Sequence, residues 1–300
     1  MKSFINYQGG KYRLINQILP LFPKKFNNFI DIFCGSGVVA TNHYLEDKYG
    51  TGKYLLNDIN KPLISLIEYI SECKIEEFIE EVEAIIKAYN LSDTYTHTYD
   101  YYNADSSKGL AKVNKEGYLK LRNDFNHLNH SENYYAMFYT LIVFGFNNQI
   151  RFNRKGEFNL PVGKRDFNKN MRKKLIDFAK VIQADNFVFS SQDFRNISFN
   201  KNDFIYLDPP YSIATATYNE NNGWSKKDDK DLFDYMDTID SSGAMFALSN
   251  VLTHKGVTND ELIKWSENYK INFLNFDYNN SNYQSLAKDH KTVEVLITNF

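Results

Sequence analysis

The stretch Phe204-Ile205-Tyr206-Leu207-Asp208-Pro209-Pro210-Tyr211 decides the fold of this 300-residue chain. Its apolar first half predicts a buried strand. The two prolines hold the backbone extended after that strand, so Asp208 stands at a fixed place where the strand ends. The string therefore predicts that a functional side chain, Asp208, stands at the end of this strand. A rigid turn without such a role is the alternative.

Strand and helix patterns alternate on both sides of this stretch. Strands are predicted at residues 28–33, 54–57, 187–190, 204–207, 244–249 and 293–299, and helices at 11–19, 62–71 and 227–239. This alternation is typical of an α/β fold with a mainly parallel sheet. Between about residues 75 and 178 the rhythm breaks into helix-like segments and a polar stretch, which predicts an inserted helical lobe.

Composition limits the function classes. A hydrophobic content of 43% can form one medium domain with an insertion. The net charge of -2 argues mildly against nucleic-acid binding, but residues 151–174 hold nine cations against two acids, a local charge of +7. This run predicts one basic face, and an ordinary solvated helix surface is the alternative.

Cysteines and histidines do not form a recognisable site. Cys34 and Cys73 are too few for a disulfide framework or a zinc cluster, which favours a reducing cytoplasm. His127 and His130 are three residues apart, but no further ligand completes a metal site. With no apolar run of membrane length and no leader-like start, we expect neither a membrane span nor secretion.

Two further strand ends carry ligand-binding features. The strand within residues 29–33 runs into a turn where Gly35 and Gly37 let the backbone approach a ligand, although a plain tight turn fits as well. Asp58 ends the next strand, where a carboxylate can accept both ribose hydroxyls of a nucleoside. A helix cap by Asp58 or Asn60 is the alternative. Together the two motifs predict a nucleoside ligand better than either alone.

The chemistry of the Asp-Pro-Pro-Tyr string suits an amino group. The Asp208 carboxylate and the Pro209 carbonyl form a fixed pair of acceptors that can bind two amine hydrogens. The exocyclic nitrogen of adenine is a poor nucleophile because its lone pair is delocalised, and two acceptors favour a pyramidal nitrogen aimed at a sulfonium methyl. Tyr211 would stack on the base, which must leave the helix to reach this place.

Strings specific to one family occur along most of the chain. They are Tyr7-Gln8-Gly9-Gly10-Lys11, Asp31-Ile32-Phe33-Cys34-Gly35, Asn57-Asp58-Ile59, residues 146–153 and 156–165, Asp208-Pro209-Pro210-Tyr211, Trp224-Ser225 and Leu248-Ser249-Asn250-Val251. By these strings the chain resembles the Dam family of DNA adenine methyltransferases, in particular its short T-even bacteriophage type.

The resemblance implies a fold and an activity. It implies an α/β fold with a seven-stranded, mostly parallel methyltransferase (Rossmann-like) sheet and an inserted helical DNA-recognition lobe. The catalytic domain would comprise residues 1–61 and 171–300, and the recognition domain residues 62–170. S-adenosylmethionine would be the cofactor and double-stranded DNA the partner, with direct methyl transfer and neither a metal nor a membrane. We expect a monomer or weak dimer in the cytoplasm, at the nucleoid of a bacterial or phage-infected cell.

The resemblance also implies the site residues. Catalysis falls to Asp208, Pro209, Pro210 and Tyr211. The cofactor would be bound by Tyr7, Gly9, Lys11, Asp31, Phe33, Cys34, Gly35, Ser36, Gly37, Asp58, Ile59, Asp193, Phe194 and Asp208. DNA would be bound by a hairpin in the major groove, through Phe146, Asn147, Gln149, Arg151, Asn153, Pro161, Lys164 and Arg165.

The family's target sequence, GATC, is the leading expectation. By the resemblance, Arg151 reads a guanine edge and Arg165 makes a second purine contact. Gln149 stands where the family usually carries an apolar residue that packs, with Pro161, on a thymine methyl. An amide suits an adenine edge better than a methyl group, so an altered choice at the third base is the alternative.

The same residues are also compatible with other functions. Methylation of a cytosine amine, of RNA or of a glutamine amide uses related acceptor motifs, but Asp208 and the hairpin favour adenine in duplex DNA. A catalytically inactive DNA-binding protein is the alternative of another class, and the intact string at residues 208–211 opposes it. The sequence leaves open whether the chain serves restriction-modification or regulation.

Overall fold

The computed structural model describes residues 1–7, 9–47, 52–105, 109–128, 133–213, 224–275 and 292–300. The chain divides into two compact units. A helical unit comprises Met1–Gly10 and Pro62–Asp185, and a sheet unit comprises Lys11–Lys61 and Asn186–Phe300. The chain therefore passes from one unit to the other three times, after Gly10, Lys61 and Asp185.

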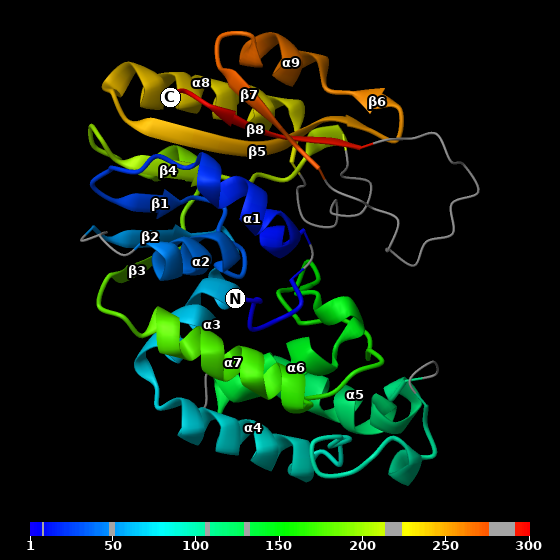
Figure 1. The fold of residues 1–300 in the computed structure, drawn as a ribbon. Helices are drawn as coiled ribbons and strands as arrows, with labels where there is room; N and C mark the ends of the chain where they lie inside the picture. The colour runs from blue at the N-terminus through cyan, green and yellow to red at the C-terminus, as the bar shows by residue number, and fades with distance from the viewer. Residues whose placement is uncertain (8, 48–51, 106–108, 129–132, 214–223, 276–291) are drawn as a thin grey trace. The chain divides into compact units, whose positions relative to one another are not determined.

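The sheet unit is built on one mixed sheet (Figure 1). Its order is β3-β2-β1-β4-β5-β8-β7, with β6 paired to β5. The strands are β1 (Phe29–Asp31), β2 (Tyr54–Asn57), β3 (Phe187–Ser190), β4 (Phe204–Leu207), β5 (Met245–His254), β6 (Val257–Thr258), β7 (Lys270–Leu274) and β8 (Val293–Thr298). The five strands from β3 to β5 pair in parallel, and β8 runs antiparallel between β5 and β7. The predicted mostly parallel α/β fold is confirmed, with β6 and β7 as strands that the sequence patterns missed.

The register of the parallel strands brings their carboxyl ends to one line. Asp31 of β1 is level with Leu56 of β2 and with Tyr206 of β4. Asp58 and Asp208 each follow two residues after those partners. Three acids from distant parts of the sequence thus lie at adjacent strand ends, which is where open parallel sheets bind ligands.

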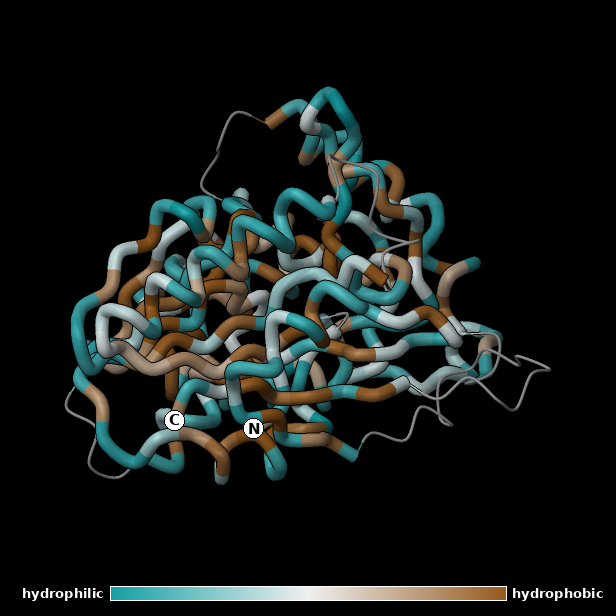
Figure 2. Tube along the Cα trace, turned by 90° about the horizontal axis from the view of Figure 1, so that it is seen from above, coloured by the Kyte–Doolittle hydropathy of each residue, from teal (hydrophilic) through white to brown (hydrophobic). Residues whose placement is uncertain are grey.

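Helices cover both faces of the sheet because its strands are apolar on both faces. Ile30 and Ile205 join the core formed with α8 (Lys226–Ser242) and α9 (Asp260–Ser266). The alternate residues Phe29 and Phe204 pack on the other face against Phe22 and against His43 of α2 (Val38–Glu46). Figure 2 shows the hydrophobic residues along the strands and the hydrophilic ones on outer turns of the helices.

The helical unit is organised around α6 (Tyr134–Phe144), in which every residue from Ala136 to Phe144 is buried. A helix that is apolar on all sides needs neighbours all round it. The surrounding helices are α3 (Lys61–Glu72), α4 (Ile75–Ala88), α5 (Ala111–His127) and α7 (Lys169–Ile182). Among them α4 and α5 pack directly on α6, and α4 also contacts α7.

The helical unit includes two segments that the sequence analysis assigned to the catalytic domain. Residues 1–10 belong to it because Phe4 is fully buried, with its ring stacked on Phe178 of α7 at 4.4 Å between centroids. The Tyr139 hydroxyl also donates to the Phe4 carbonyl. Residues 171–185 belong to it because Leu175 and Phe178 of α7 are buried. The roles assigned to the two parts of the chain remain predictions.

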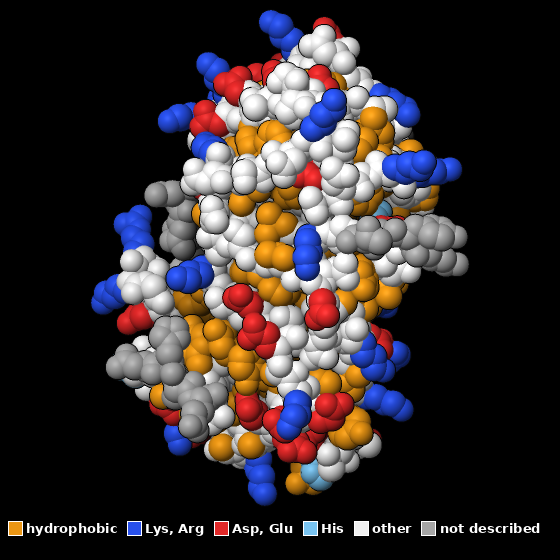
Figure 3. Space-filling model, turned by 90° about the vertical axis from the view of Figure 1, so that its left-hand side faces the viewer, with side chains coloured by type: hydrophobic (Ala, Val, Ile, Leu, Met, Phe, Trp, Pro, Cys, Tyr) orange, Lys and Arg blue, Asp and Glu red, His pale blue; other side chains and the backbone are white. Residues whose placement is uncertain are grey.

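Charged side chains are mixed on the face drawn in Figure 3. Lysine and arginine side chains stand among carboxylates and uncharged polar atoms rather than in one patch. Short-range pairs such as Lys74 with Glu77 and Lys173 with Asp177 contribute to this mixing elsewhere on the helices. Exposed pairs of this kind add little to stability.

The buried ring of Phe4 yields a prediction for stability. Phe4→Ala should lower the free energy of unfolding by about 3–5 kcal/mol, because it leaves a cavity beside Phe178. Chemical denaturation followed by circular dichroism measures the change. Leu119→Ala on α5 is the control, since Leu119 is exposed and its loss should cost less than about 1 kcal/mol. A loss below 1 kcal/mol for Phe4→Ala would show that the N-terminal segment is not docked.

Candidate active site

Asp208 follows β4 and is held by two neighbours within the sheet unit. The Lys11 ammonium lies 2.8 Å from Asp208 Oδ1, with side-chain exposures of 8% and 17%. The Tyr211 hydroxyl donates to the same oxygen at 3.0 Å, and Lys11 Nζ lies 5.0 Å from the centre of the Tyr211 ring. The predicted catalytic aspartate is therefore part of a compact triad with Lys11 and Tyr211.

The charges of this triad are well defined. Burial alone would lower the pKa of Lys11, but the Asp208 carboxylate, with smaller contributions from Tyr206 and Glu294, raises it above its ordinary value. Burial and the Asp208 charge raise the pKa of Tyr211 well above its ordinary value. Lys11 is consequently a cation and Tyr211 a neutral donor at neutral pH, and both stabilise a negative charge on Asp208.

Asp31 ends β1 and is the least compensated acid of the site. Its side chain is 1% exposed, and within the described residues neither carboxylate oxygen has a hydrogen-bond partner. Burial and then the charges of Asp208 and Asp58 raise its pKa well above the ordinary value. The buried hydroxyl of Ser36 is also without a partner in the described residues. Buried polar atoms of this kind are expected to bind a ligand or water.

The turn after β1 is a backbone cradle. Gly35 (φ 50°) and Gly37 (φ 70°) have left-handed backbone conformations that favour glycine. The Gly35 N–H donates to Asp58 Oδ2 at 2.9 Å, which joins the turn to the end of β2. Cys34 lies in the chain between β1 and Gly35, and its side chain is buried. This burial raises the pKa of its thiol well above the ordinary value. Cys34 is therefore a packing residue in this turn.

Asp58 already accepts two backbone hydrogen bonds. Its Oδ2 binds the Gly35 N–H and its Oδ1 binds the Asn60 N–H, both at 2.9 Å. Burial raises its pKa, while these two bonds lower it. These two bonds fix the Asp58 side chain in the turn before α3, and both the ribose contact and the helix cap that was its alternative remain predictions. Next to it, Ile59 is 71% exposed, and its contact with the cofactor remains a prediction.

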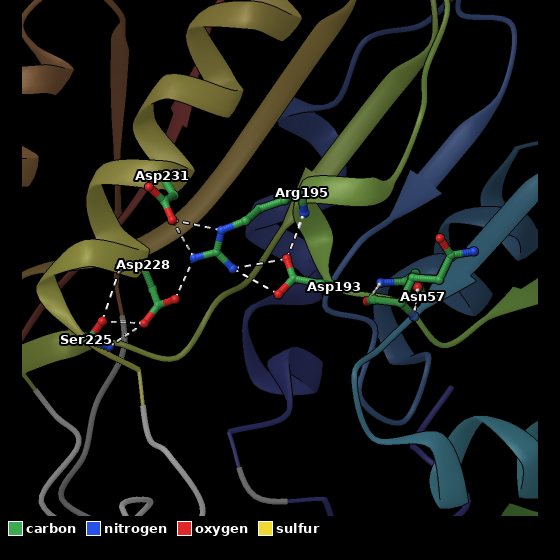
Figure 4. Close-up of polar contacts among 7 residues, drawn as sticks. Asn57, Asp193, Arg195, Ser225, Asp228 and Asp231 are labelled. Carbon is green, nitrogen blue, oxygen red and sulfur yellow. Dashed lines mark hydrogen bonds and ion pairs between the residues drawn. The ribbon is translucent and has the colours of Figure 1, made fainter.

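The side-chain amide of Asn57 holds the ends of three strands together (Figure 4). Asn57 Nδ2 donates to the carbonyls of Ile32 and Gln192, each at 3.0 Å, and Asn57 Oδ1 accepts the Gln192 N–H at 2.9 Å. Asn57 thereby connects the ends of β2, β1 and β3. In the sequence, Asn57 stands out only as part of the string Asn57-Asp58-Ile59, and its position before Asp58 is the signal for this role.

An arginine cluster fixes the apolar wall beside the cradle (Figure 4). Arg195 pairs with Asp193, Asp228 and Asp231 at 2.9, 2.5 and 2.8 Å, which joins the 3-10 helix η5 (Phe194–Asn196) to α8. The Arg195 guanidinium also lies over the Phe194 ring. Phe194 in turn contacts Phe33 and Trp224 at 5.6 and 5.7 Å between ring centres. Sequence reasoning named Asp193 and Phe194 but missed Arg195, which no motif marked.

Two predicted cofactor residues lie in the other unit. Tyr7 and Gly9 belong to the helical unit, where the Gly10 N–H donates to the Tyr7 carbonyl at 3.3 Å and Gly9 has φ of 78°. Gln8 of the same string lies outside the described residues. The other predicted cofactor residues belong to the sheet unit; Lys11 lies in the 3-10 helix η1 (Lys11–Leu14), and the rest lie at strand ends or in the turns that follow them.

The predicted DNA-binding segment forms a hairpin in the helical unit. Gly145 bridges to Val162 and Phe152 to Phe158. The Tyr118 hydroxyl and the Arg122 guanidinium of α5 both donate to the Leu160 carbonyl, so the base of the hairpin is fastened to that helix. Five of the eight predicted DNA-contact residues are exposed, namely Phe146, Asn147, Pro161, Lys164 and Arg165.

The other three predicted contacts are partly buried, and two of them hold the hairpin together. Arg151 donates through Nε and Nη2 to Asn159 at 2.8 and 3.0 Å. Asn153 Oδ1 accepts the N–H groups of Lys155 and Glu157 at the tip. Gln149, the third, follows the turn at Phe146–Asn148. The predicted base and phosphate contacts of these residues remain untested.

Arg172 does not belong to the basic face that the sequence predicted. Its exposure is 9%, it pairs with Glu83, and its guanidinium lies 4.1 Å from the Tyr95 ring centre and 4.7 Å from that of Phe167. The prediction of a basic face is therefore wrong for Arg172, because this side chain of α7 pairs with α4. Within the same run, Lys174 donates to Asn6 Oδ1 at 2.6 Å.

The described residues contain no group of three histidine, cysteine, aspartate or glutamate side chains arranged to hold a metal ion. In the part of the chain that is described, none of the helices is both long enough and apolar enough to span a bilayer.

Comparison with known proteins identifies relatives among DNA modification enzymes. The chain is 35% identical over 309 residues to the type II methyltransferase M.FokI of Planomicrobium okeanokoites and 37% identical over 311 residues to the modification methylase StsI of Streptococcus sanguinis. Each alignment covers all of this chain but only 43% of the relative, so the chain spans less than half the length of these two proteins. A DNA adenine methylase of Haemophilus influenzae is 32% identical over 213 residues, covering 70% of this chain and 64% of that protein.

A family model also matches most of the chain. The model described as D12 class N6 adenine-specific DNA methyltransferase matches residues 7–280, which include the string at 208–211, the glycine turn and the hairpin. These are the features that the structure places at the strand ends of the sheet unit and on the surface of the helical unit. This chain therefore belongs to the D12 class N6 adenine-specific DNA methyltransferase family.

Proposed function

We propose that this chain methylates the exocyclic amine of adenine in duplex DNA and takes the methyl group from S-adenosylmethionine. The observation that carries the proposal is the triad at the end of β4, where Lys11 and Tyr211 both hold Asp208 Oδ1. Family membership supports the adenine amine as the acceptor. The names of the relatives, two modification methylases and a DNA adenine methylase, are consistent with it.

The residues at the strand ends suit S-adenosylmethionine. Asp31 is a buried carboxylate without a hydrogen-bond partner in the described residues, and an amino-acid ammonium would supply both charge and donors. The turn at Gly35 and Gly37 lets a ligand approach the backbone, and the buried Phe194 ring supports Phe33 in an apolar wall beside this turn. When bound, the cofactor supplies an electrophilic methyl group on a sulfonium.

Asp208 has the central role in the proposed reaction. Its carboxylate and the Pro209 carbonyl accept the two amine hydrogens and orient the nitrogen lone pair. The Lys11 ammonium, 2.8 Å from Asp208 Oδ1, holds this carboxylate at the end of β4. In the structure the Tyr211 hydroxyl also binds this carboxylate, and the ring is proposed to stack on the base that enters. No metal and no covalent intermediate take part in this proposal.

The hairpin is the proposed reader of the DNA sequence. Its exposed residues Phe146, Pro161 and Arg165 are available to a major groove, and Arg151 is held in one orientation by Asn159. A fixed guanidinium loses less side-chain entropy on binding than a mobile one. The relation to the short bacteriophage enzymes in particular, the oligomeric state and a location at the nucleoid remain predictions.

The role of Asp208 can be tested directly. Asp208→Ala should abolish methyl transfer and leave DNA affinity largely intact, because the side chain acts on the amine and not on the phosphates. Transfer of labelled methyl groups to unmethylated duplex, together with a binding titration, measures both. Asp234→Ala on α8 is the control, since Asp234 is exposed and should leave activity unchanged. More than about a tenth of the wild-type kcat in Asp208→Ala, a loss below roughly 1.4 kcal/mol, contradicts the role.

Asp31 should have opposite effects on stability and on cofactor binding. The pKa of Asp31 is raised in the folded protein, so the free energy of unfolding falls as the pH rises from the ordinary carboxyl pKa to this raised pKa. Asp31→Asn removes the ionisable group and with it this loss of stability. We expect a higher melting temperature at pH 7 and a cofactor affinity at least about tenfold weaker, as for a lost buried ion pair. Asp58→Ala is the contrast, because it loses two backbone hydrogen bonds and should lower stability. Unchanged cofactor affinity in Asp31→Asn argues against the ammonium contact.

The target sequence is the third expectation. Single-molecule sequencing of DNA from cells that express the chain should show modified adenines in GATC, with relaxed choice at the third base as the alternative due to Gln149. Gln149→Leu should then shift the third position towards thymine, because an apolar side chain prefers the methyl group. Modification confined to GATC in both variants would eliminate the altered-specificity hypothesis. A motif without the first or last guanine-cytosine pair would eliminate the contact predicted for Arg165 or Arg151.

A further inference from the structure

Four lysines line a groove between α8 and α9 of the sheet unit, which lie next to each other in Figure 1. They are Lys226, Lys227, Lys230 and Lys264, and we refer to this feature as the lysine groove. Phe233, Trp265, Glu261 and Asn268 complete its lining. Glu261 is the one acid among these eight residues, so the groove carries a strong positive charge in a chain whose net charge is -2.

The four lysines are exposed and form no ion pair among the described residues. The carboxylates of α8, by contrast, are used inside the unit. Asp228 and Asp231 bind Arg195, and Asp229 accepts from the Trp224 indole at 2.6 Å. Helix α8 therefore contains more acids than lysines, yet the fold engages several of the acids and leaves the lysines to solvent.

The helix dipole makes the position of these lysines unfavourable for stability. Lys226, Lys227 and Lys230 lie within the first five residues of α8, where the partial positive charge of a helix N-terminus opposes cations. Asp228 and Asp229 offset this in the same turn. Cations that stabilise neither the helix nor a neighbouring carboxylate are better explained by a ligand outside the chain.

The groove has a rigid apolar floor. The rings of Phe233 and Trp265 are stacked at 5.0 Å with an interplanar angle of 11°. The Trp265 indole donates to Asp237 at 2.9 Å, and the Tyr269 hydroxyl donates to the same carboxylate oxygen. The lysine stems can pack along these rings while their ammonium groups stay in water. The four lysines thus line a groove whose floor is fixed by these aromatic contacts.

The lysine groove begins at the edge of the sheet where the active-site triad lies. Helix α8 is the first helix after β4, whose carboxyl end carries Asp208, and α9 follows β5 and β6. Both helices therefore start at the carboxyl edge of the parallel strands. A duplex that presents an adenine to Asp208 has its neighbouring phosphates near this edge.

We propose that the lysine groove binds backbone phosphates of the DNA that flanks the target site. This inference rests on the proposed function, because it takes the duplex at Asp208 as given. Lysine ammonium groups bind phosphates as point charges and carry no sequence information, so the contact adds affinity and register but not specificity. A nucleic acid fits the groove better than an acidic protein because α8 and α9 begin at the same edge of the sheet as Asp208, where the proposed substrate binds.

The experiment compares two matched variants on short and long duplexes. Lys226→Gln, Lys230→Gln and Lys264→Gln are combined in the groove variant. Lys24→Gln, Lys25→Gln and Lys201→Gln form the control variant, since these exposed lysines precede β1 and β4 and lie at the opposite edge of the sheet. The dissociation constants for duplexes of about 12 and about 40 base pairs, with the target central, are measured across a salt series.

We expect the groove variant to bind the long duplex about tenfold or more weakly, with the slope of log affinity against log salt reduced by about 2.7, about 0.9 for each of the three lost contacts. Its binding and methylation of the short duplex should equal wild type, and the control variant should match wild type on both. Equal loss in both variants, or no loss on the long duplex, overturns the proposal. The latter result would assign the groove to an acidic protein partner. Failure of the proposed function is distinct, because wild type would then not methylate the short duplex.

Discussion

The site depends on how three neighbouring carboxylates are compensated at the carboxyl ends of parallel strands. The register of β1, β2 and β4 brings Asp31, Asp58 and Asp208 to adjacent strand ends. Like charges repel strongly when they are buried near one another, and the charges of Asp208 and Asp58 raise the pKa of Asp31. The structure compensates two of them. Lys11 and Tyr211 bind Asp208, and two backbone N–H groups bind Asp58. Asp31 is less compensated, because its carboxylate oxygens have no hydrogen-bond partner within the described residues and the Ala40 backbone offsets only part of the rise in its pKa. This supports the proposal that Asp31 binds a cationic part of a ligand.

The strand ends can hold this charge arrangement only if they are rigid. Asn57 connects β1, β2 and β3 through their backbones, and Arg195 connects η5 to α8 through three carboxylates. A charge-assisted network fixes geometry more strongly than isolated exposed pairs do. Neither residue needs to touch a ligand. Both hold neighbours that are predicted to contact the cofactor, Asp58 in one case and Phe194 in the other.

Charge along the sequence is a poor guide to charge on the surface of this protein. The run from Arg151 to Lys174 reads as a basic face, yet Arg172 is buried against Tyr95 and Phe167, and Arg151 is bound across the hairpin. Helix α8 reads as acidic, yet Arg195 and Trp224 engage several of its carboxylates and the lysines remain exposed. The surface charge follows from which side chains find a partner inside, and partners are chosen by tertiary packing.

The sequence by itself determined β1, β2 and β4, the acid at or just after the end of each, and the family to which the chain belongs. Those signals are local, because an apolar run followed by glycine or proline has the same meaning in any surroundings. Only the tertiary structure decided that Lys11 pairs with Asp208, that Arg195 joins Asp193 to α8, and that residues 1–10 belong to the helical unit. Each of these contacts joins residues far apart in the chain. Their energies depend on burial and distance, which composition and periodicity do not contain.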